Sequence, residues 1–395
     1  MKIKNREELI AKQEEYRASL NSQRKQILIC AGTGCVAGGS LEIYAKMKDI
    51  IEGKGLKCAL VLEKDPHGDS IGLKKSGCHG FCEMGPLLRI EPMGWLYIKV
   101  SLDDCEEIIE KSIIGDEVID RLVYKDQEGN PYVKQEDIPF YKQQTRIALE
   151  YCGHINAESI AEYLALGGYS AVAKALFDMT PQGIVDEITE SCLRGRGGGG
   201  FPAGRKWQQV LDQKEEEKYI VCNGDEGDPG AFMDRSMMEG EPHRVIEGML
   251  IAAIATGARH GYIYVRAEYP IAVERLQIAI NQAREYGLLG KNIFESGFDF
   301  DIELRLGAGA FVCGEETALM TSIEGNRGEP RPRPPFPAVK GLFASPTILN
   351  NVETWANIPQ IIINGPKWFA SMGTEKSKGT KVFALGGKIN NTGLV

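Results

Sequence analysis

The chain has 395 residues, of which 43% are hydrophobic and 26% charged, a composition typical of a globular protein with about two to three domains. The 46 Lys and Arg residues against 55 Asp and Glu residues give a net charge of -9, which disfavours a general nucleic-acid-binding protein. No uninterrupted apolar stretch approaches the roughly 20 residues that a membrane-spanning helix needs.

The N-terminal half begins with the pattern of a polar helix and continues with that of a small α/β domain. Residues 1–25 alternate charged and apolar positions at helical spacing, and the charged start lacks the apolar core of a secretion signal, so we expect a cytoplasmic protein. An α/β domain is predicted over residues 26–120, with strands at 26–30 and 57–62, a helix at 40–53, a hairpin over 87–100 and a helix at 102–112.

The rest of the chain is predicted to form a linker, a larger domain and the start of another. Residues 121–145 carry no sustained period and read as a linker across a surface. Within residues 146–370, strands and helices alternate as in an α/β domain, with strands at 219–223, 261–265 and 298–306 and helices at 244–256 and 271–285. In residues 371–395, a strand at 381–385 has no partner in sight, from which we hypothesise that the polypeptide is truncated.

Two pairs of cysteines indicate a metal or redox centre. Cys30 and Cys35 follow a strand, and Cys78 and Cys82 lie in a glycine-containing loop. Structural zinc prefers two residues between paired cysteines, which neither pair has, so the four thiolates favour a [2Fe–2S] cluster. The alternatives are four buried thiols, or a Rieske centre that uses His79. The six other cysteines read as ordinary buried thiols.

The glycine-rich stretch Arg194–Trp207 predicts an anion-binding loop. Its glycines allow backbone N–H groups to approach a phosphate closely, and Arg196 and Lys206 would add full positive charge. The spacing also fits a dinucleotide fingerprint, but it follows a helix where a strand is required, and a Walker A loop would need Lys followed by Ser or Thr. A flexible linker is the remaining reading.

Three later motifs could complete a nucleotide site. The acidic loop Asn223–Gly230 can accept hydrogen bonds from ribose or flavin, bind a hard cation, or form a solvated turn. A glycine turn at 307–314 leads to Glu315 and Glu316, which could also cap a helix. The proline-rich segment 331–337 would form a rigid pocket wall or a docking ligand, and the amides of 350–351 could bond a heterocycle or cap a helix.

These motifs carry a resemblance to a known family. In order, the motifs 194–207, 223–230, 314–317 and 350–354 resemble the FMN and NADH site of the complex I 51 kDa flavoprotein family, which includes the flavin subunits of NAD-linked hydrogenases and formate dehydrogenases. Residues 26–120 resemble the thioredoxin-like [2Fe–2S] ferredoxin domain. The fusion of the two is similar to the flavin subunit of multimeric, often electron-bifurcating, [FeFe]-hydrogenases.

The resemblance implies a set of site residues. Glu316 is expected to orient the nicotinamide as the catalytic residue, and the cluster ligands are Cys30, Cys35, Cys78 and Cys82. The expected FMN contacts are Gly195, Arg196, Gly197, Gly198, Lys206, Asn223, Asp225, Glu226, Gly314, Glu315, Asn350, Asn351 and Thr354. The expected contacts of the nicotinamide nucleotide are Phe201, Asp228, Glu316, Arg333 and Phe336. Asp228 stands where the family often has Glu, and Arg333 where it often has Lys, so the choice between NAD(H) and NADP(H) is left open.

The resemblance also implies an architecture and an activity. We expect a thioredoxin-like [2Fe–2S] domain, an α/β FMN-binding domain and an incomplete ubiquitin-like segment, with a [4Fe–4S] cluster in a missing C-terminal part. The expected activity is hydride transfer between NAD(H) and FMN, followed by single-electron transfer to iron–sulfur subunits, a hydrogenase catalytic subunit, a small thioredoxin-like [2Fe–2S] subunit or ferredoxin. Alternatives are a formate dehydrogenase or respiratory NADH dehydrogenase subunit, a nucleotide triphosphatase and a non-catalytic electron-relay scaffold.

Overall fold

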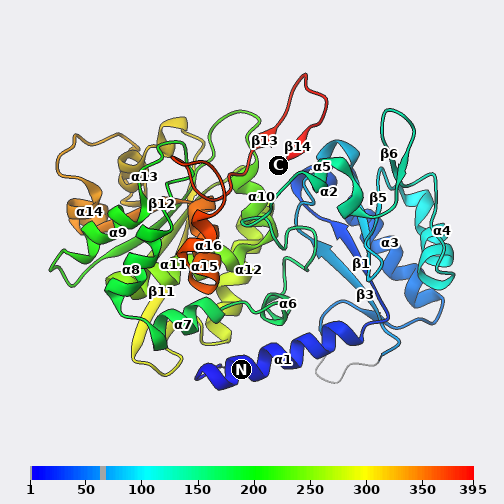
Figure 1. Cartoon of the computed structure of the whole chain (residues 1–395), viewed down its shortest axis with the longest axis horizontal. Coiled ribbons are helices and arrows are strands. Elements are labelled where there is room, and N and C mark those ends of the chain that lie inside the picture. The colour runs from blue at the N-terminus through cyan, green and yellow to red at the C-terminus, as the bar shows by residue number, and fades with distance from the viewer. Residues whose placement is uncertain (1, 63–67) are drawn as a thin grey trace. The chain divides into compact units, whose positions relative to one another are not determined.

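The computed structural model describes residues 2–62 and 68–395 (Figure 1), so Met1, the first residue of the predicted N-terminal segment, lies outside the described residues. The chain divides into two compact units. The small unit consists of Lys12–Leu166, Glu239–Glu241 and Phe383–Val395, and the large unit consists mainly of Gly167–Met238 and Pro242–Val382. Residues up to Ala11, with the start of helix α1 (Arg6–Ser22), are grouped with the large unit.

The small unit is built on a five-stranded sheet. Its strands are β1 (Lys25–Cys30), β2 (Cys58–Ala59), β3 (Ile71–Ser76), β4 (Leu88–Glu91) and β5 (Trp95–Tyr97), in the order β2-β3-β1-β4-β5. Strand β1 runs parallel to β3 and antiparallel to β4, which pairs with β5 as a hairpin. A parallel β-α-β unit followed by an antiparallel hairpin is the thioredoxin-like arrangement, so the predicted fold of this region is confirmed.

Helices cover this sheet through apolar faces at helical spacing. Helix α3 (Ser40–Gly53) buries Ile43, Met47 and Ile51 in the same core as strands β1, β3 and β4. After the hairpin, η2 (Leu102–Asp104), α4 (Cys105–Glu107) and the π-helical turn η3 (Ile108–Ile114) form one helical run, as the pattern over 102–112 predicts. The core therefore leaves the loops after β1 and β3, which carry the four selected cysteines, at one end of the sheet.

The segment 121–145, predicted as a linker across a surface, carries elements of its own that pack on the small unit. Strands β6 (Tyr124–Lys125) and β7 (Pro131–Tyr132) pair as a hairpin, followed by η4 (Gln135–Asp137) and α5 (Pro139–Lys142). Phe140 of α5 stacks on Phe81 with ring centroids 4.7 Å apart. This aromatic contact places α5 beside the loop between Cys78 and Cys82.

The small unit extends to Leu166, beyond the boundary at 145/146 that the sequence pattern indicates. Helix α6 (Ile160–Ala165) carries Glu162, whose carboxylate lies 2.9 Å from Lys74 Nζ on β3, and both side chains are 1% exposed. The backbone N–H of Ala157 also donates to Lys75 O at 3.1 Å. A buried charge pair is held only where its partners are fixed, which ties residues 147–166 to this sheet.

The large unit is an α/β domain, as expected. Its sheet has the order β10-β11-β9-β8-β12, in which β8 (Tyr219–Gly224), β9 (His260–Arg266), β11 (Phe298–Gly307) and β12 (Thr347–Asn351) run parallel. Strand β10 (Gly290–Ile293) joins the edge antiparallel to β11. The parallel strands bring the carboxyl ends of β8 and β12 to one edge, where open α/β sheets bind ligands.

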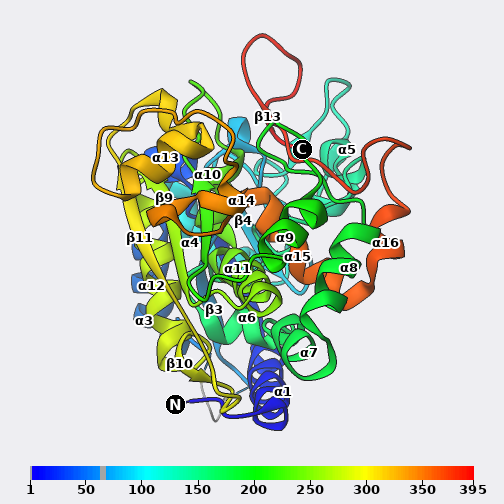
Figure 2. The same cartoon turned by 90° about the vertical axis from the view of Figure 1, so that its left-hand side faces the viewer.

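Helices pack on both faces of the large unit's sheet, and α13 lies beyond the carboxyl end of β11 (Figure 2). Helix α11 (Pro242–Thr256) is buried along its length and meets α15 (Val352–Asn364) so closely that a Cβ on Gly248 would lie 2.2 Å from Trp355 O. The remaining helices are α7 (Ser170–Asp178), α8 (Pro181–Glu190), α9 (Ala203–Leu211), α10 (Met233–Gly240), α12 (Pro270–Glu285), α13 (Glu316–Ile323), α14 (Pro337–Lys340) and α16 (Pro366–Ala370). Among the described helices, none has the length and apolar character that crossing a membrane requires.

The last residues form a closed hairpin, which corrects the expectation of an unpaired strand after residue 381. Strand β13 (Ala384–Leu385) pairs antiparallel with β14 (Gly393–Leu394), and the glycine turn joins them. Within the small unit, Leu394 N donates to Gly80 O at 2.7 Å. The backbone groups of β14 are therefore satisfied by β13 and by the Cys78–Cys82 loop.

Candidate functional site

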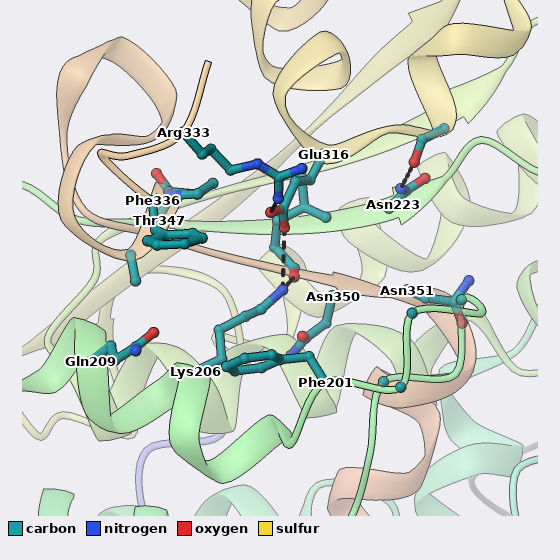
Figure 3. A pocket seen from close by; sticks show the side chains of 18 residues that line it. Phe201, Lys206, Gln209, Asn223, Glu316, Arg333, Phe336, Thr347, Asn350 and Asn351 are labelled. Carbon is teal, nitrogen blue, oxygen red and sulfur yellow. Dashed lines mark hydrogen bonds and ion pairs between the residues drawn. The ribbon is translucent and has the colours of Figure 1, made fainter. Parts of the chain in front are cut away.

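A cavity of about 350 Å³ opens at the carboxyl ends of β8 and β12 in the large unit (Figure 3). We call it the glycine-loop cavity. Of the residues that the resemblance implies, it is lined by Gly195, Gly197, Phe201, Lys206, Asn223, Gly314, Glu316, Arg333, Phe336, Asn350 and Asn351. Five motifs that lie apart in the sequence therefore meet at one site.

Gly199, Gly200 and Pro337 also line the cavity and lie in the predicted motifs, whereas the lining residues Gln209, Ala338, Thr347 and Leu349 were not predicted as site residues. Gln209 lies one turn after Lys206 on α9, so helical spacing alone could have identified it. Arg196, Gly198, Asp225, Glu226, Asp228, Glu315 and Thr354 were predicted as contacts but are not among the residues that line this cavity.

The glycine loop folds back on itself beside α9. Gly195 N donates to Phe201 O at 2.8 Å. Gly198 and Gly200 adopt φ values of +100° and +62°, which residues other than glycine rarely adopt. A Cβ on Gly197 would lie 3.0 Å from Asn351 Cβ. Glycine is thus needed here both for the turn and for close approach to β12.

Three charged side chains form a column inside the cavity. Figure 3 shows the carboxylate of Glu316 between the side-chain nitrogens of Arg333 and Lys206. Arg333 Nη1 lies 2.7 Å from Glu316 Oε1, and Lys206 Nζ lies 3.3 Å from Glu316 Oε2. Lys206 also donates to Leu349 O at 2.8 Å. Since α9, α13 and the proline-rich segment each supply one member, only the fold brings these charges together.

Glu315 and Glu316 have different surroundings. Glu315 is the N-cap of α13 and accepts hydrogen bonds from Thr317 N and Ala318 N, both at 2.9 Å. Its other oxygen lies 3.2 Å from Arg333 Nη2. Glu315 therefore fixes the start of the helix, whereas Glu316 lines the cavity.

Arg196 does not place its charge in the cavity, contrary to the sequence prediction. Its side chain is 4% exposed, and Nη2 donates to Lys378 O at 2.6 Å while Nε lies 3.9 Å from Glu353 Oε1. Its backbone N donates to Thr354 Oγ1 at 2.9 Å. Arg196 and Thr354 therefore anchor the glycine loop from the protein interior, because the Arg196 side chain bonds to Lys378 O and its backbone bonds to Thr354.

The two asparagines at the end of β12 are held by buried neighbours. Asn351 caps α15 by accepting from Glu353 N at 2.9 Å, and its Nδ2 donates to Asp234 Oδ2 at 2.5 Å. With its amide oriented to satisfy both neighbours, Asn350 donates to Leu349 O and accepts from Trp207 Nε1, each at 3.1 Å. Both amides reach the cavity from a rigid strand end.

The acidic loop after β8 divides its side chains among different tasks. Asn223 Nδ2 donates to Gly314 O at 2.9 Å and so joins the acidic loop to the glycine turn at 307–314. Glu226 accepts from Met233 N and Arg235 N at the start of α10, and burial raises the pKa of its carboxyl. Asp228 lies in a second cavity, of about 490 Å³, together with Arg235 and Arg266.

Asp225 supplies a buried acceptor beside the glycine-loop cavity. Its Oδ2 has no hydrogen-bond partner within the described part of the chain, and it lies 3.9 Å from where a Cβ on Gly314 would stand. Burial raises the pKa of this carboxyl, which Arg266 opposes from 3.9 Å. Asp225, the glycine N–H groups and Lys206 together fit a phosphorylated heterocycle with a ring N–H, such as FMN.

The four selected cysteines of the small unit also come together. Cys30 is the last residue of β1, and Cys35 lies on α2 (Thr33–Ala37). Cys78 lies in the loop after β3, and Cys82 comes directly after Phe81 as the first residue of η1 (Cys82–Met84). Cys78 Sγ lies 3.6 Å from Cys82 Sγ, and Cys35 and Cys78 lie near enough to the buried Cys30 thiol to raise its pKa. Loops at one sheet end thus present four sulfur atoms to each other.

The surroundings of these thiols fit a two-iron cluster. Gly80 N donates to Cys78 Sγ at 3.4 Å, and a Cβ on Gly85 would lie 2.8 Å from Cys35 Sγ, so glycine backbone curls around the sulfurs. Among the described residues, no three ligand side chains converge on one point as a single metal ion would require. A [2Fe–2S] cluster places two thiolates on each iron and needs no such point.

The Rieske alternative would need two histidine ligands. His79 is fully buried, its Nε2 lies 2.8 Å from Ser76 Oγ, and burial lowers its pKa to about 3. Among the remaining cysteines, Cys192 is exposed and Cys58 half-buried, so the prediction of buried thiols was wrong for these two.

Comparison with known proteins agrees with this geometry. Residues 188–360 match the family described as the Nuo51 FMN-binding domain. Over 254 residues the chain is 62% identical to the NADP-reducing hydrogenase subunit HndC of Solidesulfovibrio fructosivorans, covering 64% of this chain and 51% of that protein. It is 49% identical over 242 residues to an NADH-quinone oxidoreductase subunit of Rhizobium meliloti, covering 61% of this chain and 56% of that protein.

A solved structure extends the likeness to both units. The NAD+-reducing [NiFe]-hydrogenase in its H2-reduced state matches 96% of this chain and 61% of its own, with 27% identity and a TM-score of 0.55. The chain spans about half the length of the curated relatives that it matches. The match to the Nuo51 FMN-binding domain is confined to residues 188–360, which include the glycine loop and the ends of β8 and β12.

Proposed function

We propose that this chain is an FMN-dependent NAD(P)H dehydrogenase subunit. FMN would occupy the glycine-loop cavity, a nicotinamide nucleotide would lie over it, and the electrons would leave through a [2Fe–2S] cluster on Cys30, Cys35, Cys78 and Cys82. The observation that carries the proposal is the convergence of the glycine loop with the Lys206–Glu316–Arg333 column in one cavity.

The chain's own residues would hold and orient the two cofactors. Backbone N–H groups of the glycine loop and the Lys206 ammonium would bind phosphate. Asp225 Oδ2, which has no partner among the described residues, would accept a hydrogen bond from the flavin ring N–H. Asn350 and Asn351 would contact the flavin from the rigid end of β12. When bound, FMN supplies the conversion of a two-electron hydride into single electrons.

The nicotinamide nucleotide would be positioned rather than protonated. Phe201 and Phe336 are 42% and 56% exposed at the cavity, which is unusual for large aromatic side chains and leaves their faces free to stack on a ligand. Glu316, held by two cations, would accept the carboxamide N–H and set the angle of the ring. Holding the two rings in reactive geometry is the contribution that a hydride transfer needs from the protein.

The choice between NAD(H) and NADP(H) would depend on the second cavity. There Asp228 lines the same space as Glu226, Glu268, Arg235 and Arg266, so three acids oppose and two cations favour a ribose phosphate. We propose NAD(H) as the main substrate. NADP(H) is the alternative, since a relative with 62% identity is named as NADP-reducing.

The finer assignment is a place in a multisubunit, electron-bifurcating [FeFe]-hydrogenase. It is supported by the fusion of a thioredoxin-like unit to the flavin domain and by the relative named as a hydrogenase subunit. The partners would be iron–sulfur subunits, a hydrogenase catalytic subunit, a small [2Fe–2S] subunit or ferredoxin, in the cytoplasm, and a further [4Fe–4S] cluster would receive the electrons. A formate dehydrogenase or respiratory NADH dehydrogenase assembly is the alternative.

One anaerobic experiment tests the core of the proposal. The purified chain, reconstituted with FMN, iron and sulfide, is titrated with NADH and then NADPH while the absorption spectrum is recorded. Bleaching of the flavin band is the expected result. Iron and sulfide without any flavin binding would instead indicate an electron-relay scaffold, and Mg²⁺-dependent nucleotide hydrolysis without flavin would indicate a triphosphatase.

A further inference from the structure

A tyrosine in the small unit packs in the same apolar cluster as two of the four cysteines, and its hydroxyl has no hydrogen-bond partner among the described residues. Tyr141, on α5, is 8% exposed and belongs to the same apolar cluster as Cys30 and Cys35. Its Oη atom is buried and makes no hydrogen bond with any described residue. Leaving a buried hydroxyl without a hydrogen bond destabilises the folded protein, so the Tyr141 hydroxyl calls for an acceptor.

The Tyr141 ring is fixed on two sides. It makes an edge contact with Phe81, the residue before Cys82, with ring centroids 5.8 Å apart and an interplanar angle of 81°. The guanidinium of Arg146 lies over the ring, 4.9 Å from its centroid. Arg146 in turn donates to His79 O at 3.1 Å and therefore links the ring to the cysteine loop. The hydroxyl has little freedom to seek another partner.

The thiols lie within electrostatic range of this hydroxyl. Burial raises the pKa of Tyr141, Arg146 opposes that rise, and negative charge on Cys78, Cys30 and Cys82 adds to it. Two other tyrosines of this unit differ, because Tyr97 Oη lies 2.7 Å from Ser112 Oγ and Tyr132 donates to Asp126 Oδ2 at 3.1 Å. Tyr141 thus combines closeness to the cysteines with an unused donor.

We propose that the Tyr141 hydroxyl donates a hydrogen bond to a sulfur atom of the [2Fe–2S] cluster held by Cys30, Cys35, Cys78 and Cys82, and so raises its reduction potential. The inference rests on the cluster in the proposed function. Hydrogen bonds to sulfur stabilise the more negative, reduced cluster, which is why they help to set the potential of iron–sulfur centres. Tyr141 would be a positioning and tuning residue, not a ligand.

The test compares Tyr141→Phe with the unchanged chain, both carrying FMN and iron–sulfur. The midpoint potential of the cluster, measured by EPR-monitored titration, should become more negative in the variant, by about 59 mV if the reduction equilibrium changes tenfold. Tyr132→Phe is the matched control, since its hydroxyl already has Asp126 as a partner, and it should leave the potential in place. A donor restored by 4-aminophenylalanine at position 141 should recover the potential.

Pulsed ENDOR on the unchanged chain avoids dependence on the folding of a variant. With ring-deuterated tyrosine incorporated, the reduced cluster should show deuteron couplings from the ring positions next to a hydroxyl. An unchanged potential in Tyr141→Phe, or no such couplings, would overturn the inference while leaving the cluster standing. A reconstituted chain without iron and sulfide would overturn the proposed cluster itself and this inference with it.

Discussion

Arg333 Nη1 lies 2.7 Å from Glu316 Oε1, inside the cavity where the glycine loop meets the end of β12. Lys206 approaches the other oxygen of the same carboxylate. A carboxylate between two cations is held in one orientation. Such a group is a fixed acceptor for an amide N–H, which is the property that we assign to it toward nicotinamide.

Glu316→Gln should therefore lower kcat/KM for NADH by about tenfold or more, because the amide loses both charge partners and no longer offers two equivalent acceptors. FMN content should remain unchanged. Stopped-flow reduction of the flavin by NADH measures the effect. Glu303→Gln, which removes a carboxylate from an exposed pair with Arg305, serves as the matched control. Full turnover and unchanged affinity in Glu316→Gln would show that the residue has no part in orienting the nucleotide.

Gly197→Ala should weaken FMN binding. The new methyl group would stand 3.0 Å from Asn351 Cβ, so either the loop or the end of β12 has to move, and both line the cavity. We expect at least about a tenfold rise in the dissociation constant of FMN, measured by quenching of flavin fluorescence. Gly53→Ala, where a Cβ meets nothing within 4 Å, controls for a general effect of the substitution. Equal FMN affinity in the two variants would contradict the predicted role of the glycine loop.

Cys82→Ala should reduce the iron and sulfide content at least about tenfold, since it removes a sulfur that lies 3.6 Å from Cys78 Sγ. Flavin content should persist, because the residues that line the glycine-loop cavity belong to the large unit. Cys58→Ser, at a half-buried cysteine outside the group of four, should keep the cluster. Full iron and sulfide in Cys82→Ala would remove this residue from the ligand set.

His243 should make the large unit sensitive to acid. The ring is buried, with Nδ1 2.9 Å from Tyr169 Oη and Nε2 3.1 Å from Gln282 Oε1, and burial lowers its pKa to about 4 from the ordinary 6.5. A lowered pKa means that the folded state favours the neutral ring. The stabilisation is complete above pH 6.5 and is lost as the pH falls towards 4.

Between pH 7 and 5 this histidine should remove about 2 kcal/mol from the free energy of unfolding, as 1.5 pH units at 1.36 kcal/mol each. Urea unfolding of the apoprotein at both pH values measures it. His243→Gln should show the smaller dependence on pH, whereas His260→Gln, at an exposed position, should behave as the unchanged chain. The same slope in all three proteins would refute the assignment to His243.

Many of the helices and strands could be predicted from local sequence patterns. The period of apolar residues located α3, α11, α12 and the central strands, because each element buries one face or a continuous run. Cysteine spacing and glycine clusters identified the loops that we propose to bind the cofactors, because paired cysteines and clustered glycines have few other structural uses. The family resemblance identified the residues of the cavity, most of which do line it.

Tertiary structure decided what depends on partners far away in the sequence. Glu162 meets Lys74 across the small unit and moves its boundary to Leu166, and α5 packs on Phe81 although residues 121–145 show no period. The Arg196 side chain points inward because it donates to Lys378 O and lies beside the Glu353 carboxylate. Burial and long-range pairing set these outcomes, and neither is encoded in the spacing of neighbouring residues.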